Sequence, residues 1–225
     1  MREALHQFLD RVPQPGDHLL INGDLFEFWF EYGTVVPREA FPTLAKLAAA
    51  CQRGVRVTVT GGNHDRWSRG FWERELGARF YPGSVELTLA GWRALVAHGD
   101  GLAETENRAW VLHVLTRHPL AAAAFRWVHP DVGQALVKRF GGVLGSRARD
   151  RRVREQAAAA QARWARELLA SRGDLELVVL GHTHQPMLLS VAEGRWYVNP
   201  GAWMEGLWYA EITEGGPVLR TYLPR

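Results

Sequence analysis

Hydrophobic and polar residues follow different periods along this chain of 225 residues, and each change of period predicts a new element. Residues 1–12 and 37–53 place apolar side chains three or four positions apart, which indicates amphipathic helices. A third, Trp-rich helix is expected over 67–76. Short apolar runs bounded by turn residues predict strands among these helices. They cover residues 18–22, 55–60, 84–89, 92–97 and 175–180.

The second half of the chain changes from a helical pattern to an extended one. From residue 104 to about residue 172 the pattern is helical, with breaks at Pro119, Pro130 and Gly141-Gly142. Four short strands are predicted after this block, at residues 187–191, 196–198, 207–212 and 218–222. The mixture of helices and strands predicts an α/β fold. The length fits a single domain over 1–225 that carries the helical block, about 104–172, as an insertion.

Charge is concentrated in one segment. The formal net charge is +3, yet residues 138–172 alone contain ten Lys or Arg and three Asp or Glu. A segment of this kind can face phosphates or an anionic membrane, and it can equally be a solvated helix face. The sequence leaves both interpretations open.

Cysteine content and hydropathy bear on the compartment. Cys51 is the only cysteine, which excludes an internal disulfide framework and a cysteine-rich metal site. The first residues lack the basic-then-apolar pattern of a signal peptide, and no run of about 18 apolar residues is present. We therefore expect a cytoplasmic protein in which Cys51 is a small buried side chain.

Four separate strands are followed by residues that can bind a metal ion. Taken singly, each signal is weak, because Gly-Asp is an everyday turn and a lone His is more often structural. The four together indicate one site, because strand ends meet at the carboxyl edge of an α/β sheet. The residues are Asp24, Asn63 with His64 and Asp65, His98, and His182 with His184.

The types of ligand restrict the metal. Imidazole nitrogens with carboxylate or amide oxygens, and no sulfur, suit Mn²⁺, Fe²⁺, Zn²⁺ or Co²⁺ better than Ca²⁺. One carboxylate can bridge two such ions, and two-metal sites serve in-line displacement at phosphorus. The pattern therefore predicts a divalent-metal-dependent hydrolase of a phosphoester or phosphoanhydride.

These motifs resemble, in order and spacing, those of the calcineurin-like metallophosphoesterases. The motifs are Gly23-Asp24, Gly62-Asn63-His64-Asp65, His98-Gly99-Asp100 and Gly181-His182-Thr183-His184. Within that superfamily, residues 23–32, 98–102 and 127–133 and the basic helices after them look like bacterial UDP-2,3-diacylglucosamine diphosphatases of lipid A biosynthesis. The resemblance implies a metallophosphoesterase-like α/β fold with two facing β-sheets flanked by helices and a helical cap insertion. We expect the C-terminal hairpins to join the second sheet.

The resemblance also implies a ligand set. Asp24 would bridge two divalent ions, which the family suggests are Mn²⁺. Asn63, His98 and His182 would complete the ligand set of one ion, and His184 would be a ligand of the other. The substrate would be UDP-2,3-diacylglucosamine, cleaved to UMP and 2,3-diacylglucosamine 1-phosphate.

Two residues have an expected catalytic role on the same basis. His64 is similar to the family residue that contacts the phosphate and helps the leaving group, and Asp65 would orient it. Asn63, His64 and His182 would contact the substrate.

The helical insertion would cover the acyl chains of the substrate at the inner membrane surface, where the protein would bind peripherally. Its apolar residues would line the cleft, although ordinary helix packing also explains them. They are Trp110, Leu112, Leu115, Phe125 and Trp127. No nucleic-acid partner is expected on this interpretation. Two rival interpretations stay open: a phosphodiesterase for a soluble or nucleic-acid substrate, and a catalytically impaired metal-binding remnant.

One departure from the family affects the second ion. The family opens with a strand that ends in Asp-X-His and supplies two ligands to the metal shared with His184. Here Asp17 and His18 are adjacent, and they precede the apolar strand residues Leu19–Ile21 instead of ending a strand. We therefore expect a chain that begins downstream of that strand, binds one metal well and the second poorly, and has reduced activity.

Overall fold

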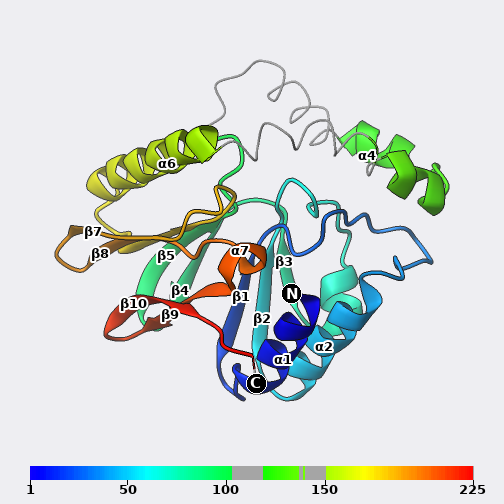
Figure 1. The fold of residues 1–225 in the computed structure, drawn as a ribbon, viewed down its shortest axis with the longest axis horizontal. Coiled ribbons are helices and arrows are strands. Elements are labelled where there is room, and N and C mark those ends of the chain that lie inside the picture. Colours follow the sequence, from blue (N-terminus) through cyan, green and yellow to red (C-terminus); the bar gives the residue numbers. More distant parts are fainter. Residues whose placement is uncertain (103–118, 137–138, 140–150, 225) are drawn as a thin grey trace.

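The computed structural model describes residues 1–102, 119–136, 139 and 151–224 (Figure 1). Helices and strands are mixed along the chain, as the sequence predicts. The first half contains α1 (Arg2–Arg11), β1 (His18–Asn22), α2 (Phe41–Gln52), β2 (Arg56–Thr60), the π-helical turn η1 (Trp72–Leu76), β3 (Arg79–Tyr81), β4 (Val85–Leu89) and β5 (Trp92–Ala97). The second half contains α4 (Pro119–Phe125), α6 (Arg151–Ser171), β6 (Leu177–Leu180), β7 (Met187–Ala192), β8 (Arg195–Asn199), α7 (Trp203–Gly206), β9 (Trp208–Thr213) and β10 (Gly216–Thr221).

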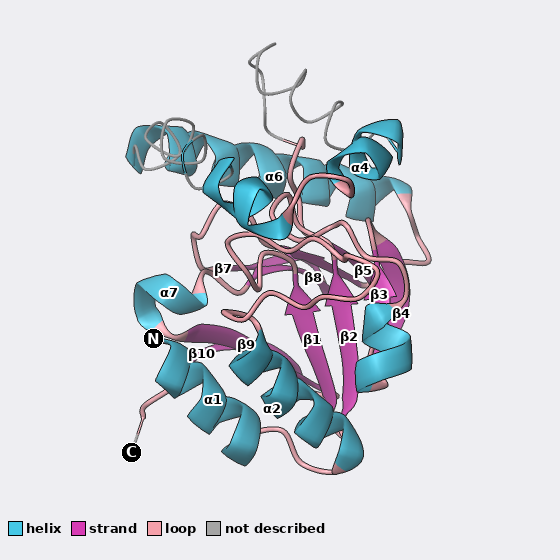
Figure 2. Ribbon diagram, turned by 90° about the vertical axis from the view of Figure 1, so that its right-hand side faces the viewer, coloured by secondary structure: helices cyan, strands magenta, loops and turns pink. Residues whose placement is uncertain are grey.

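The first sheet is parallel and has the order β1-β2-β3. Its central strand β2 is buried at four of five positions, as a strand covered on both faces should be. Leu44 and Leu47 of α2 pack with Val57 and Val59 of β2 in one core cluster. Figure 2 shows α1 and α2 side by side below the arrows of β1 and β2. The two predicted amphipathic helices are thus the outer layer of this sheet.

The second sheet has the order β4-β5-β6-β8-β7, with β5, β6 and β8 parallel and the edge strands antiparallel. All four residues of β6 are buried, and they alternate between two clusters. Val178 and Leu180 pack with α6, whereas Leu177 and Val179 belong to a second cluster against which Leu20 of β1 packs. The two sheets therefore face each other, as expected, with β1 contributing to the layer between them.

The last hairpin differs from the prediction. We expected all the C-terminal hairpins to join the second sheet, but β9 and β10 hydrogen-bond only to each other among the named strands of the described residues. Ala210 and Ile212 of β9 pack against the second sheet, and the Tyr209 ring lies 5.1 Å from Phe8 of α1. Side-chain packing places this ribbon, and no backbone pattern could have signalled that.

Two helices of the first half were predicted with wrong bounds. The helix expected over 67–76 is the short η1, which ends at Gly77 with φ +73°. The first turn of the helix expected from residue 37 is instead a turn, and α2 begins at Phe41 with Pro42 directly after it, as proline favours helix starts. Strand β3 was missed because three residues are too few for a periodic signal.

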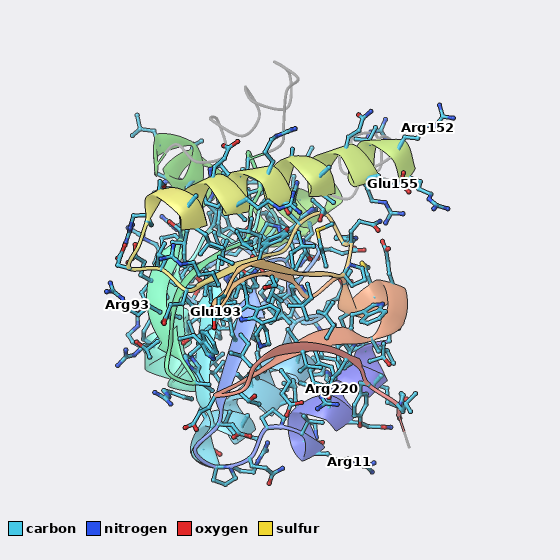
Figure 3. The ribbon with its side chains drawn as sticks, turned by 90° about the vertical axis from the view of Figure 1, so that its left-hand side faces the viewer. Arg11, Arg93, Arg152, Glu155, Glu193 and Arg220 are labelled. Carbon is cyan, nitrogen blue, oxygen red and sulfur yellow. The ribbon has the colours of Figure 1, made fainter. Side chains whose placement is uncertain are left out.

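The helical block contributes to two places. Ala162, Ala165 and Leu169 of α6 pack on the second sheet, while the other end of α6, with Arg152 and Glu155, projects outward (Figure 3). Phe125 of α4 contacts core aromatic rings, and Trp127 is 93% exposed. Trp110, Leu112 and Leu115 lie outside the described residues. Within the described ranges, none of the helices is long and apolar enough to cross a membrane.

Candidate metal centre

Sheet register brings the motif residues to one edge of the molecule. Asn22 pairs with Thr60 at the ends of β1 and β2, and Ala97 pairs with Leu180 at the ends of β5 and β6. The Gly181 amide then donates to the His98 carbonyl at 2.9 Å, so these two strands deliver their motifs side by side. Figure 2 shows the arrows of β1 and β2 ending beneath the loops that lie below α4 and α6.

Three of the predicted metal ligands converge at this edge. Asp24, His98 and His182 each offer a ligand atom, and these atoms all lie within 4.8 Å of one another. His98 Nε2 lies 3.0 Å from Asp24 Oδ2, and the rings of His98 and His182 have centroids 5.2 Å apart. A carboxylate with two imidazoles is a donor set for a borderline divalent ion.

The backbone at the centre is held in an unusual conformation. Asp24, His182 and His184 have positive φ angles of 53°, 68° and 59°, a region that costs non-glycine residues free energy. Such residues cluster at functional sites because surrounding structure holds them there. All three are residues that the sequence singled out as ligands.

Two glycines leave room for the ligands. A Cβ at Gly62 would lie 2.1 Å from Asp24 Oδ1, and a Cβ at Gly23 would lie 2.4 Å from His98 Nδ1. Gly23 also has φ +77°, which other residues rarely adopt. The glycines before Asp24 and Asn63 therefore serve close approach of the ligand loops.

His98 is oriented by the backbone. Its Nδ1–H donates to the Asn22 carbonyl at 2.8 Å, which directs Nε2 toward Asp24 and His182. Burial disfavours the charged ring, but the Asp24 carboxylate outweighs it and raises the pKa of His98 to about 9. Burial likewise acts to raise the pKa of Asp24, and His98 holds it well below its usual range.

The residues present fit a metal ion. Asn63 Oδ1 is buried and has no hydrogen-bond partner among the described residues. Buried polar atoms are rarely left in this state, and an amide oxygen on the motif loop that bonds Asp24 is explained by a cation that it would bind. Asn63 was predicted as a ligand on its motif alone.

Asp65 is fully buried, and its hydrogen bonds go to the backbone. Its carboxylate accepts N–H groups of Asp24, Leu25 and Gly62 at 3.2, 2.7 and 2.8 Å. Burial, with the nearby Asp24 charge, raises the pKa of Asp65. Asp65 thus joins the loop after β1 to the loop after β2.

His64 is held by other groups. Its Nδ1–H donates to the Glu27 carbonyl at 2.7 Å, and its backbone amide donates to Asp24 Oδ1 at 3.0 Å. The orientation that we expected from Asp65 is therefore supplied directly by Glu27, and Asp65 acts on this ring through the loop backbone. The side chain of His64 is exposed at the edge of the centre.

His184 stands apart from the three-ligand group. Its Nδ1 lies 3.0 Å from Glu205 Oε1, which also binds Arg154 Nη1 at 2.6 Å. Within the described ranges, the converging set of three or more His, Cys, Asp or Glu ligands is the one at Asp24, and it omits His184. His18 bonds Thr58 Oγ1 at 2.8 Å near the opposite end of β1, away from the centre.

A buried ion pair beside the centre was not predicted. The Arg66 guanidinium bonds the Asp100 carboxylate, and their side chains are only 7% and 6% exposed. Arg66 directly follows Asp65, and Asp100 lies two residues after His98. The signal was the place of Arg66 directly after one motif segment and of Asp100 within another, although neither residue was predicted as a metal ligand.

Comparison with known proteins identifies the class. A sequence model described as calcineurin-like phosphoesterase matches residues 1–186, and the chain belongs to that family. It is therefore a metallophosphoesterase, an enzyme of a metal-dependent family, and the cluster of Asp24, His98 and His182 is its candidate metal-binding group.

The chain is also similar to individual curated proteins named UDP-2,3-diacylglucosamine hydrolase. The one from Porphyromonas gingivalis is 28% identical over 225 residues, covering 93% of this chain and 85% of the relative. The one from Xanthomonas campestris pv. campestris strain ATCC 33913 is 30% identical, and the match covers 95% of this chain and 86% of the relative. The one from Tolumonas auensis is 26% identical, and the match covers 94% of this chain and 86% of the relative.

Proposed function

We propose that this enzyme hydrolyses the pyrophosphate of UDP-2,3-diacylglucosamine and releases UMP and 2,3-diacylglucosamine 1-phosphate. The observation that carries this proposal is the similarity to hydrolases named for that substrate over 93–95% of the chain. The convergence of Asp24, His98 and His182 at one sheet edge supports a phosphoryl-transfer centre of the required kind.

The metal site of the proposal has two unequal parts. Asp24, Asn63, His98 and His182 would hold one divalent ion, with Mn²⁺ the first choice and Fe²⁺, Zn²⁺ and Co²⁺ the alternatives. His184 would serve a second ion together with Asp24, and we expect this site to be weaker. Bound ions would offset the negative charge of the phosphoryl oxygens and lower the pKa of water.

His64 would act on the substrate phosphate. Its Nδ1–H is engaged by the Glu27 carbonyl, so Nε2 is the atom left to face a ligand. When Nε2 also carries a proton, it can contact a phosphoryl oxygen and pass that proton to the leaving group. Asn63 and His182 would contact the substrate from the same edge, and Asp65 would hold the two loops together.

The insertion and the membrane complete the proposal. The helical block at about 104–172 would form the cap, and Phe125 already packs against Phe30 and Trp67 of the core loops. Its basic residues would face anionic headgroups at the cytoplasmic side of the inner membrane. The exposed Trp127 suits an interfacial position.

The direct test is an assay of UDP-2,3-diacylglucosamine hydrolysis with added Mn²⁺, in which the released UMP is measured. Wild type should release UMP, His98→Ala should release almost none, and His64→Ala should bind Mn²⁺ like wild type but turn over more slowly. Cleavage of bis(4-nitrophenyl) phosphate without cleavage of the lipid substrate would contradict the substrate assignment. Tight Mn²⁺ binding without any turnover would favour a catalytically impaired remnant.

A further inference from the structure

A cavity of about 390 Å³ lies where the segment after α4 meets the core loops. It lies apart from the proposed metal ligands, because none of its lining residues belongs to that set. They are Glu31, Tyr32, Gly33, Arg69, Arg74 and Arg126. Three guanidinium groups around one cavity, with a single carboxylate, are an unusual concentration of positive charge.

The carboxylate is already used inside the protein. Glu31 is 8% exposed, and its Oε2 accepts the backbone N–H groups of Arg69 and Phe71. Its Oε1 lies 3.4 Å from Arg74 Nη2. Glu31 thus folds the 69–74 segment around itself, which places Arg69 and Arg74 on one side of the cavity.

The third cation comes from another element. Phe125, at the end of α4, packs against Phe28, Phe30 and Trp67, with ring centroids 5.0–6.4 Å away. This packing fixes the next residue, and the Arg126 guanidinium lies 5.4 Å from the centroid of the Phe30 ring. A buried carboxylate therefore holds the segment that carries two of these arginines, and an aromatic cluster holds the third.

The cavity has the electrostatics of an anion site. Three guanidinium groups and one carboxylate leave an excess of two positive charges, and their mutual repulsion favours a bound counter-ion.

We propose that this cavity binds the phosphate group of an anionic ligand, with Arg69, Arg74 and Arg126 as its cationic contacts. The planar guanidinium fork matches phosphate oxygens in a bidentate manner. A volume of about 390 Å³ is in the range of small-molecule sites, so it holds a phosphate with part of an organic group. The ligand is a soluble phosphate ester or the headgroup of an anionic lipid.

The proposal does not depend on the substrate of the metal centre, and its test avoids that centre. The whole chain is treated with EDTA, and binding is measured for inorganic phosphate, UMP, and phosphatidylcholine vesicles with and without phosphatidylglycerol. The test variant is Arg69→Gln with Arg126→Gln. The matched control is Arg11→Gln with Arg220→Gln, which removes two charges on another face (Figure 3).

We expect at least one probe to bind wild type and the control equally and the test variant about tenfold or more weakly, since charge-assisted hydrogen bonds are lost. If the test variant loses binding of UMP or phosphate, the ligand is a soluble phosphate compound. If it loses only the binding of phosphatidylglycerol vesicles, the ligand is a lipid headgroup. Equal binding of every probe by the test variant and wild type, or no binding to wild type, overturns the proposal. Arg69→Lys with Arg126→Lys keeps the charges and should restore part of the affinity.

Discussion

The two histidines of Gly181-His182-Thr183-His184 lie two residues apart and have different surroundings. His182 joins Asp24 and His98, whose ring is 4% exposed and fixed by a backbone carbonyl. His184 is 35% exposed and contacts Glu205, a residue of the short helix α7. The first group is placed by the register of β5 and β6 at the centre of a sheet, and the second by surface side chains. A ligand set positioned by sheet register is preorganised for a metal, whereas a surface ion pair must rearrange.

Breaking one ion pair in each region gives the largest difference. Arg66→Gln removes the guanidinium that neutralises the buried Asp100 carboxylate and should lower the free energy of unfolding by about 3–5 kcal/mol. Arg154→Gln removes the partner of Glu205 beside His184, and a surface pair should cost about 0–1 kcal/mol. Urea denaturation of both variants with EDTA present measures this without any contribution from metal.

The control for this comparison is the double variant Arg66→Gln with Asp100→Asn. Removing both charges should recover part of the lost stability, because the buried negative charge is removed together with its cation. If Arg66→Gln and Arg154→Gln lowered the free energy of unfolding equally, the burial of the Arg66–Asp100 pair would not determine its contribution to stability. The two regions would then not differ as proposed.

Removing one histidine from each region separates the two proposed ions. His98→Ala should weaken binding of the tightest Mn²⁺ by more than about a hundredfold, since even the outer partners of a ligand change affinity by 10–100-fold. His184→Ala should leave that ion within about threefold and affect only a weaker second one, because a half-buried side chain outside the cluster contributes little to the first ion. Calorimetric titration of EDTA-treated protein with Mn²⁺ gives both values.

The opposite ranking would contradict the unequal site. Two ions bound with similar affinity to wild type, each lost on one substitution, would show that His184 finds enough ligands for a complete second site. His6→Ala is a useful control, because His6 bonds Thr43 on the α1–α2 face and lies outside the motif segments.

The same contrast explains what the sequence could predict. Strands ending at Asp24, Asn63, His98 and His182 were foreseeable because period-2 runs and glycines are local signals, and parallel register brings their ends together. The Arg66–Asp100 pair and the Glu205–His184 contact were not foreseeable, since residues 34 and 21 positions apart meet only after packing. The placement of β9 and β10 was missed for the same reason.

Proton release on metal binding should distinguish the Asp24–His98 pair from the His184–Glu205 pair. The pKa of His98 in the metal-free protein is raised from 6.5 to about 9, so its ring is charged at neutral pH and must lose a proton before Nε2 can bind a metal. Mn²⁺ affinity should therefore rise by up to about tenfold per pH unit until pH 9.

The stability that the charged ring adds to the metal-free chain should change with pH in the opposite direction. It is complete below pH 6.5 and is lost as pH rises through 9. Urea denaturation of EDTA-treated protein across this range checks the second trend, and Asp24→Asn, which removes the carboxylate that raises the pKa, should flatten it. A pH dependence that survives Asp24→Asn would assign the proton to another group and remove the Asp24–His98 pair as the feature that sets the two regions apart.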